Sequence, residues 1–391
     1  MLAFEKALKI VLESARFLGD EKVDISQVLN RVLAEDVKSD IDMPPSDRAV
    51  MDGYACRRRD LSNELKIVET IPAGKKPDKE IGQNQCARIM TGAVMPKGAD
   101  CVIMVEFTEN PRENRVRFFG DDENDYIRRK GVDLRAGQVV LNKGIIIEPR
   151  HIAVLAAAGH TEVLVSKKPE AGIVATGSEL VEPYVVPTSS QIRNSNSMQL
   201  MAQFAKIDVQ ARYYGITKDS VDEIDAIFKK AASENDVVTL SGGVSMGEYD
   251  FVKEMLKQNN VRLLFEKIAL KPGKPTVFGM RDDLYCFGIP GNPVSTYAVF
   301  ELIIKPFLYK LMGHDYSTLH IEMPLAQNLR RKDTERLGWF PVKITEDGKL
   351  EPLEYHGSAH INALSEADGL VSMDIGASEI PEGSVVSVRL I

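Results

Sequence analysis

The pattern of apolar and polar residues changes several times along the chain. Residues 4–18, FEKALKIVLESARFL, repeat apolar positions at helical spacing. The stretch 24–37, DISQVLNRVLAEDV, continues in the same way behind Asp24 or Ser26, either of which can cap a helix. From 41 to 130, strand-like pieces such as CVIMVEF alternate with Pro, Gly and Asp turns. We therefore expect two N-terminal helices followed by a β-rich module.

The second half of the chain has a different rhythm. The segment 136–170 contains the pattern of two short strands, a helix and a further strand. From about 169 to 313, apolar strand patterns alternate with amphipathic helical ones, the strands being EAGIVATG, VQARYYGI, DVVTLSGG and LYCFGIPG. This alternation predicts a doubly wound α/β domain with a parallel sheet covered by helices on both faces. The short strand patterns after Gly313 predict a small β module.

Composition places the chain among globular proteins with more than one domain. It has 391 residues, of which 44% are hydrophobic and 27% charged. The net charge of −8 without a long basic block argues against nucleic acid as a partner. The longest apolar runs are too short to span a bilayer, and the N-terminus lacks the pattern of a secretory signal. We expect a cytoplasmic protein that does not bind membranes.

Cysteine and histidine usage gives no sign of a disulfide framework or a zinc site. The four cysteines include no CxxC pair, and the six histidines are scattered. Candidate chemistry must therefore come from other residue types.

Three loops of the α/β region have the composition of a ligand site. They are TGSEL (176–180), SGGVSMGEYD (241–250) and PGNPVS (290–295), and each follows a predicted strand. Ligands of open α/β sheets bind beyond the carboxyl ends of the strands. Glycines let the backbone approach a ligand, and helix N-termini attract anions, so phosphate-bearing ligands suit these loops. Tight turns alone would also explain the glycines.

Charged residues near these loops have two interpretations each. The loop KPGKP places Lys271 and Lys274 beside a glycine turn, where they could bind an oxyanion or simply be solvated. The acids Glu179, Asp219 and Asp250 lie at predicted strand ends or helix starts. They could bind Mg²⁺, which takes one or two carboxylates beside phosphate, or cap helices.

Longer motifs reveal a family resemblance. The stretches MPPSDRAVMDGYA, RIMTGAVMPKGADCVIMVE, KGVDLRAG, VATGSEL, SGGVSMGEYD, KPGKP and GIPGNPVS occur in this order. Together they resemble the MoeA family of molybdopterin molybdenumtransferases, which is related to the E domain of gephyrin. The resemblance covers nearly the whole chain.

The resemblance implies an α/β multidomain fold. A segmented linking domain would comprise residues 1–40 and 131–166, with an inserted β-rich module at 41–130. A MogA-like molybdopterin-binding α/β domain would span 167–313, and a C-terminal β-barrel-like domain 314–391. Family members are elongated homodimers whose cleft lies between the α/β domain of one subunit and the inserted module of the other.

The resemblance also implies a reaction. Adenylylated molybdopterin is hydrolysed, molybdate-derived metal enters the pterin dithiolene, AMP is released, and Mg²⁺ assists. A MogA-like adenylyltransferase is a candidate partner. The same resemblance assigns catalytic roles to Asp52, Thr91, Asp133, Glu179, Asp219 and Asp250, and cation binding to the last three. Candidate binding positions for pterin and oxyanion are Ser241, Gly242, Gly243, Ser245, Asn194, Asn196, Lys271, Lys274, Pro275, Ser295, Arg336 and Ser358.

Other functions stay open at this point. Tungstate could replace molybdate, because the two oxyanions are alike in size and charge. A non-catalytic scaffold that binds molybdopterin is the alternative of a different class, but it would not need both the acids and KPGKP. A pterin adenylyltransferase would need only the α/β domain and not the MDGYA module.

Overall fold

The computed structural model describes residues 1–120, 122–244, 251–354 and 357–391. A six-stranded sheet forms the largest unit, in the order β16 (Ala211–Thr217), β13 (Ala171–Thr176), β17 (Val237–Ser241), β21 (Leu284–Ile289), β20 (Val277–Arg281) and β18 (Arg262–Phe265). The four strands expected from the sequence are parallel, as predicted, whereas β20 runs antiparallel to both of its neighbours, β21 and β18. A tight turn at Asp282, whose φ is +52°, joins β20 directly to β21 as a hairpin, which the alternation of strands and helices does not predict.

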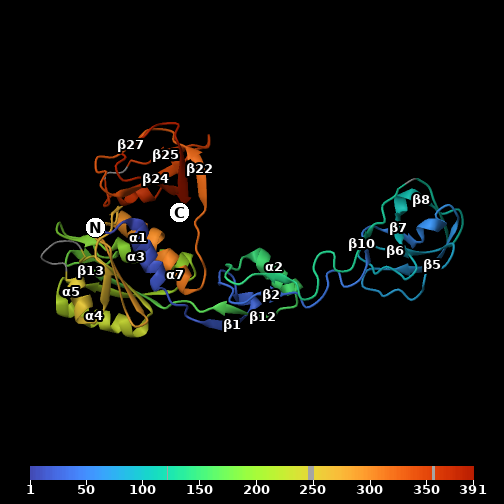
Figure 1. Cartoon of the computed structure of the whole chain (residues 1–391), viewed down its shortest axis with the longest axis horizontal. Helices are drawn as coiled ribbons and strands as arrows, with labels where there is room; N and C mark the ends of the chain where they lie inside the picture. Colours follow the sequence, from blue (N-terminus) through green and yellow to red (C-terminus); the bar gives the residue numbers. More distant parts are fainter. Residues whose placement is uncertain (121, 245–250, 355–356) are drawn as a thin grey trace.

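Helices cover both faces of this sheet (Figure 1). One face carries α1 (Phe4–Ser14), α3 (Ser195–Lys206), α6 (Pro293–Val299), a π-helical turn (Phe300–Ile304) and α7 (Lys305–Leu311). The other face carries α4 (Val221–Glu234) and α5 (Val252–Gln258). Alternation along β17 explains the division, since Val237 contributes to the first core and Val238 and Leu240 to the second.

The N-terminal helix packs on the α/β unit. Phe4, Ala7 and Val11, which share one face of α1, are buried in the same core as Phe307 of α7. By its packing, α1 thus belongs with the α/β unit and not with residues 131–166.

The second helix expected from the sequence, over 24–37, does not form. Only a 3₁₀ turn (Ile25–Gln27) is present, capped by the Asp24 side chain, which accepts from the Ser26 amide at 2.8 Å. Asn30 has a φ of +63°, which a continuous helix cannot accommodate. The apolar residues instead form the core of a small module, in which Leu33 packs with residues of α2 and β12.

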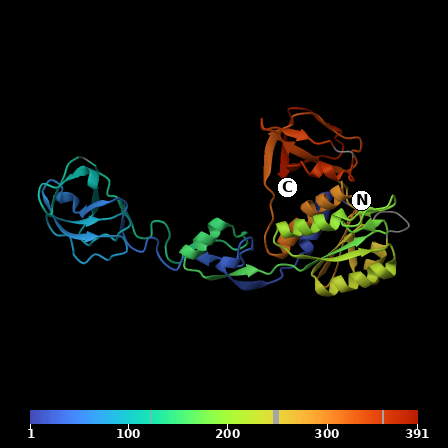
Figure 2. The same ribbon diagram turned by 180° about the vertical axis from the view of Figure 1, so that it is seen from behind.

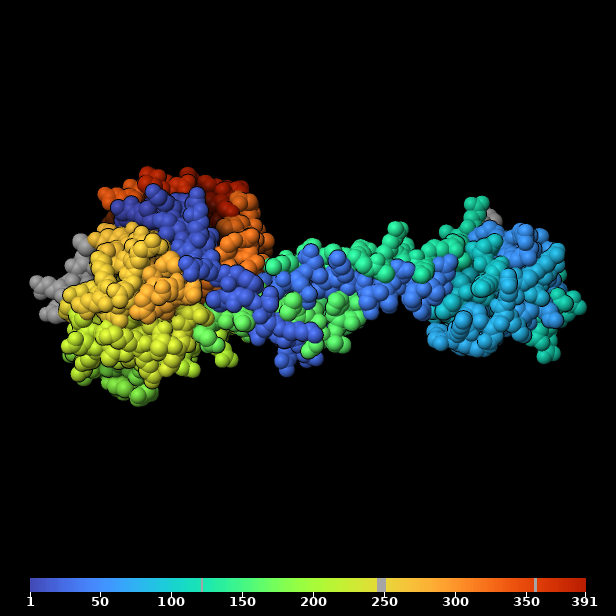
Figure 3. Space-filling model, turned by 60° about the horizontal axis from the view of Figure 1, so that its bottom comes forward, coloured from blue at the N-terminus to red at the C-terminus, as the bar shows by residue number. Residues whose placement is uncertain are grey.

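This small module links the two ends of the molecule. It pairs β1 (Asp20–Asp24) with β12 (Glu162–Ser166) and β2 (Val37–Lys38) with β11 (Val139–Leu141), next to α2 (Pro149–Ala157). The whole chain is elongated, with a narrow middle between two wider ends (Figures 2 and 3).

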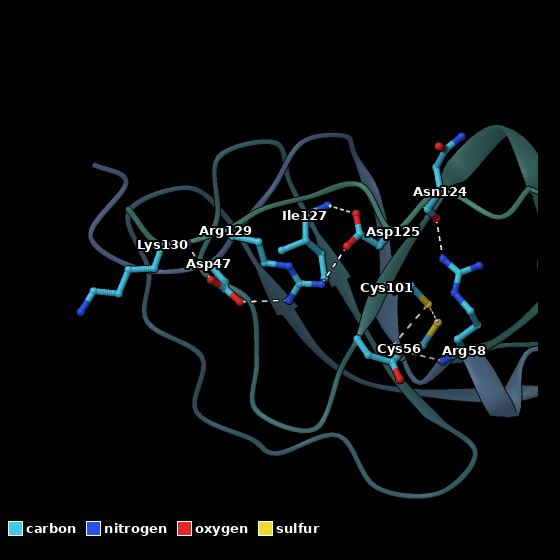
Figure 4. A network of polar contacts seen from close by, with 10 residues as sticks. Asp47, Cys56, Arg58, Cys101, Asn124, Asp125, Ile127, Arg129 and Lys130 are labelled. Carbon is cyan, nitrogen blue, oxygen red and sulfur yellow. Dashed lines mark hydrogen bonds and ion pairs between the residues drawn. The ribbon is translucent and has the colours of Figure 1, made fainter. Parts of the chain in front are cut away.

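A β-rich module forms the far end. Its sheet has the order β7 (Cys101–Met104), β4 (Gly53–Cys56), β6 (Gln85–Ile89), β5 (Leu65–Ile71), β9 (Arg115–Phe118) and β8 (Thr108–Glu109), with 3₁₀ turns at Arg58–Asp60 and Val105–Phe107. At its base, β3 (Arg48–Ala49) pairs with β10 (Ile127–Arg128). Arg129 bridges Asp47 at 3.2 Å and Asp125 at 2.7 Å, which ties the entering and leaving segments together (Figure 4).

The C-terminal module is a curved sheet on top of the α/β unit. Its order is β19 (Leu270–Lys271), β24 (Leu337–Ile344), β26 (Gly369–Met373), β28 (Val385–Leu390) and β22 (His320–Pro324). Smaller elements are β25 (Leu350–Pro352), β23 (Leu329–Arg330) with β27 (Glu379–Ile380), and a 3₁₀ turn (Ile361–Leu364). Since β19 precedes the strands of this module by more than forty residues and lies within the α/β segment, the two units share backbone hydrogen bonds.

In the described parts of the chain, every helix is too short or too polar to cross a lipid bilayer.

Candidate active site

A cavity of about 710 Å³ opens at the carboxyl ends of β13, β17 and β21. All three glycine-bearing loops found in the sequence contribute to it, and so do Ala359 and Ile361 of the C-terminal module. Of the candidate residues, those that line the cavity are Glu179, Asn194, Asn196, Asp219, Ser241, Gly242, Gly243 and Pro275. The structure therefore brings together residues that lie far apart in sequence.

The glycines after β17 have a structural requirement as well as space for a ligand. Gly242 has a φ of +98°, and a Cβ there would lie 2.3 Å from the Thr176 carbonyl oxygen. Its amide donates to the Ile289 carbonyl at 3.0 Å. Gly243, with a φ of +62°, lies against the same Thr176 side chain. Only glycine fits this close approach to Thr176. The glycines are therefore required by the turn itself, and this requirement is compatible with a ligand at the same loop.

Two asparagines organise the entrance of α3. Asn194 caps the helix by accepting from the Ser197 amide at 3.2 Å, and its Nδ2 donates to the Tyr213 hydroxyl at 2.8 Å. Asn196 is 8% exposed. Its Nδ2 donates to Ser241 Oγ at 2.9 Å and to the Gly291 carbonyl at 2.7 Å. Asn196 thereby ties the loops that follow β17 and β21.

The two described acids lie at neighbouring strand ends. Asp219 follows β16, and Glu179 follows β13. The Ser178 amide donates to Asp219 Oδ2 at 2.9 Å, and the Asp219 amide donates to Ser178 Oγ at 3.2 Å. These reciprocal bonds fix Asp219 beside the loop that carries Glu179. Mg²⁺ beside phosphate takes oxygen ligands from one or two carboxylates, and Glu179 and Asp219 are side chains of this type.

Within the described residues, no group of three or more His, Cys, Asp or Glu side chains is arranged to hold a metal by itself. Ser245 and Asp250, both candidates from the sequence, lie outside the described residues.

The loop after β21 meets the C-terminal module. Asn292 Nδ2 donates to Ser358 Oγ at 2.7 Å, and the Val294 amide donates to the Ser358 carbonyl at 3.1 Å. Ser358 is thus placed at the start of α6. Ser295, one residue further into α6, is buried.

A group of three charges lies where the KPGKP loop meets the C-terminal module. Asp333 Oδ2 is 3.4 Å from Lys271 Nζ and accepts a hydrogen bond from Arg336 Nη2. The Arg336 hydrogen bond, the Glu335 amide and the nearby cations hold the pKa of Asp333 well below its usual range. Lys274, in the same loop as Lys271, is exposed. Of the three cations assigned to the oxyanion, Lys271 and Arg336 are therefore already paired with one carboxylate.

The remaining candidates lie elsewhere in the molecule. Asp52 Oδ1 accepts from both the amide and the hydroxyl of Thr91, each at 2.7 Å, and these bonds lower the pKa of Asp52. Asp133 pairs with Arg128 next to the base of the β-rich module. The β-rich module that carries Asp52 and Thr91 is at the end of the molecule opposite the α/β unit (Figure 1), and Asp133 lies in the segment that leaves this module after β10. One chain alone does not bring these residues to the cavity.

Sequence reasoning missed several residues of the site. The sequence signal for Asn292 is its place as the polar residue of the PGNP loop, and that for Thr176 is its place as the last residue of β13. Asp333 lies three residues before Arg336, but its contact to Lys271 has no signal in the sequence because Lys271 is distant along the chain.

Comparison with known proteins agrees with this geometry. Residues 2–159 match the family model for the MoeA N-terminal region (domain I and II). Residues 172–310 match a probable molybdopterin binding domain, and residues 324–391 match the MoeA C-terminal region (domain IV).

Relatives match over their full length. A molybdopterin molybdenumtransferase of Staphylococcus epidermidis is 33% identical, with 100% of this chain and 95% of the relative covered. One from Staphylococcus aureus is 37% identical, with 99% and 94% covered. The crystal structure of a molybdopterin biosynthesis MoeA protein from Pyrococcus horikoshii superimposes with a TM-score of 0.86 at 29% identity, covering 100% of both chains. The chain therefore belongs to the MoeA family of molybdopterin molybdenumtransferases.

Proposed function

We propose that this chain acts in molybdenum cofactor biosynthesis, where it inserts molybdate-derived metal into adenylylated molybdopterin and releases AMP. The observation that carries the proposal is the convergence of three glycine-bearing strand ends on one cavity beside a cationic loop. The glycines at these strand ends leave room for the backbone to approach the phosphates of the nucleotide-activated pterin closely. A tetrahedral dianion suits lysine, arginine and hydroxyl donors.

The proposed site has two parts, one for the pterin and one for the oxyanion. Ser241, Gly242 and Gly243 bind the pterin phosphates, with Asn194 and Asn196 at the mouth of the same cavity. Lys271, Lys274 and Arg336 bind the oxyanion, together with Pro275, Ser295 and Ser358.

Glu179 and Asp219 are the described residues that would hold Mg²⁺, and Asp250 is the third candidate from the sequence. When bound, the cation would neutralise the pyrophosphate that joins the pterin to AMP, in which hydrolysis breaks the P–O–P bond. The fixed position of Asp219 beside the loop of Glu179 supports this assignment.

We infer a homodimer in which Asp52 and Thr91 of one subunit complete the cavity of the other, with Asp133 at the base of the same module. The support is the distance between the β-rich module and the cavity within one chain (Figure 1). Mixing Asp52→Asn with Lys271→Ala subunits tests this, because a mixed dimer keeps one intact site. Recovery of activity is expected, and the absence of any recovery after subunit exchange would refute the shared site.

We place the enzyme in the cytoplasm, with a MogA-like adenylyltransferase as supplier of the substrate. The four cysteines are all free and buried, which suits a reducing compartment.

The test of the function is incubation with adenylylated molybdopterin, molybdate and Mg²⁺, with AMP release as the signal. Lys271→Ala combined with Lys274→Ala should weaken molybdate binding more than pterin binding. A matched control removes two lysines of the C-terminal module, Lys343 and Lys349, which pair with exposed acids. Pterin binding without AMP release would favour the scaffold function, and preference for tungstate would change the metal.

A further inference from the structure

One carboxylate contacts two of the three cationic side chains of the proposed oxyanion site, Lys271 and Arg336. Asp333 Oδ2 contacts Lys271 Nζ and Arg336 Nη2, and the three side chains are 29%, 33% and 20% exposed, respectively. Each cation therefore already has part of its charge compensated by Asp333, while other N–H donors of both side chains remain for a ligand.

The backbone keeps the two cations close together. Lys271 pairs with Gly338 in the parallel ladder of β19 and β24. The Arg336 carbonyl accepts from Arg331 Nη1 at 2.7 Å, and Arg331, which is buried, also donates to the Ala377 carbonyl at 2.8 Å. Two like charges fixed in this way repel each other, and an anion between them relieves the repulsion.

An oxyanion that binds here competes with Asp333 for Lys271 and Arg336. With Asp333 in place, the local charge of Lys271, Arg336 and Asp333 is +1, whereas without the carboxylate it would be +2. A dianion is therefore attracted less strongly, and it must either displace the carboxylate or bind beside a like charge.

We propose that Asp333 is a built-in counter-anion that occupies Lys271 and Arg336 until an oxyanion displaces it, and so limits how tightly the oxyanion binds. The inference rests on the proposed function, because it assumes that these cations form the oxyanion site. In this role Asp333 is a positioning residue that sets affinity and release and takes no part in the chemistry.

The two carboxylate oxygens have separate contacts, which makes the idea testable. Oδ2 faces the cations, whereas Oδ1 accepts from the Glu335 amide at 3.1 Å and stabilises the local turn. Asp333→Asn keeps a carbonyl oxygen for the turn and removes the charge. Asp333→Ala removes both.

The experiment is calorimetric titration of the full chain with molybdate at low and high salt. Asp333→Asn should bind molybdate about tenfold more tightly than the wild type, equivalent to about 1.4 kcal/mol. Its affinity should also fall more steeply with salt, because the uncompensated cations attract the dianion over a longer range. Asp347→Asn is the matched control, since it removes one acidic charge from the turn at the opposite end of β24 and should leave molybdate affinity unchanged.

The outcomes are distinguishable. If Asp333→Asn binds molybdate equally or more weakly while the wild type binds, the carboxylate orients the cations and does not compete, and the inference is overturned. If neither protein binds molybdate, the oxyanion site itself is refuted and the inference falls with it. Tighter binding by Asp333→Asn together with loss of affinity in Asp333→Ala would support the charge effect and show that the turn is also needed.

Discussion

Asn196→Ala tests whether the cavity depends on one buried amide. Its two hydrogen bonds, to Ser241 Oγ and the Gly291 carbonyl, are the described side-chain ties between the loops after β17 and β21. A net hydrogen bond is worth about 0.5–1.5 kcal/mol, so losing both should destabilise the α/β unit by about 2 kcal/mol. Alanine is favourable in a helix, so α3 itself should persist.

The same loss of stability limits how much Asn196→Ala can weaken ligand binding. If the two loops hold their binding arrangement less often, the apparent dissociation constant rises in proportion. A loss of 2 kcal/mol sets an upper limit of about thirtyfold, and we expect about tenfold weaker binding of adenylylated molybdopterin. Calorimetric titration gives the affinity, and scanning calorimetry gives the stability of the α/β transition.

Asn259→Ala is the matched control. Asn259 is 6% exposed and also donates two hydrogen bonds, to Asp225 Oδ1 at 2.6 Å and the Met255 carbonyl at 2.9 Å, at the end of α5 away from the cavity. It should destabilise the unit by a similar amount and leave pterin affinity unchanged. The reasoning would be refuted by wild-type affinity in Asn196→Ala, or by equal losses of affinity in both variants.

Three further predictions concern other parts of the chain. Lys305→Met should destabilise the fold by about 3–5 kcal/mol, because it removes the cation 2.9 Å from Glu301, whose side chain is 2% exposed and keeps the neutral Gln203 amide. Lys310→Met in the same helix breaks an exposed pair and should change stability by less than about 1 kcal/mol in thermal unfolding. The pKa of Asp52 is lowered by its hydrogen bonds to Thr91 in the neighbouring turn. The ionised carboxylate therefore stabilises this turn at pH values above the ordinary carboxyl pKa, and the contribution is lost as pH falls through the lowered pKa. An ordinary pKa for Asp52 in a carboxyl NMR titration would contradict this geometry. Burial raises the pKa of Cys286 to about 12, so thiol reagents near neutral pH should label it only after unfolding, and rapid labelling of the native protein would count against this burial.

The α/β unit was predictable because its strands are buried on both faces. Apolar runs such as AGIVAT, followed by amphipathic helices, have a periodicity that tertiary contacts reinforce. The hairpin of β20 and β21 has only a weak signal in the sequence, because its turn is formed by Asp282 in a left-handed conformation and Asp283 rather than by a glycine. The helix expected over 24–37 failed because Asn30 takes a left-handed conformation, and its apolar residues pair with strands more than a hundred positions away.

Part of the candidate site could likewise be predicted from the sequence, and part could not. Loops at the ends of parallel strands converge by topology, so Glu179, Ser241 and Asn292 could be placed near one another from strand order alone. Asp333 could not, because its contacts depend on how β24 aligns with β19. Contacts between residues of different structural units become apparent only in the folded chain.

The pairing of β19 with β24 has a mechanical consequence. Because this ladder joins Lys271 to Gly338, two positions after Arg336, main-chain hydrogen bonds at this end of the molecule set the separation of the two backbones. That separation does not depend on the orientation of the remote β-rich module.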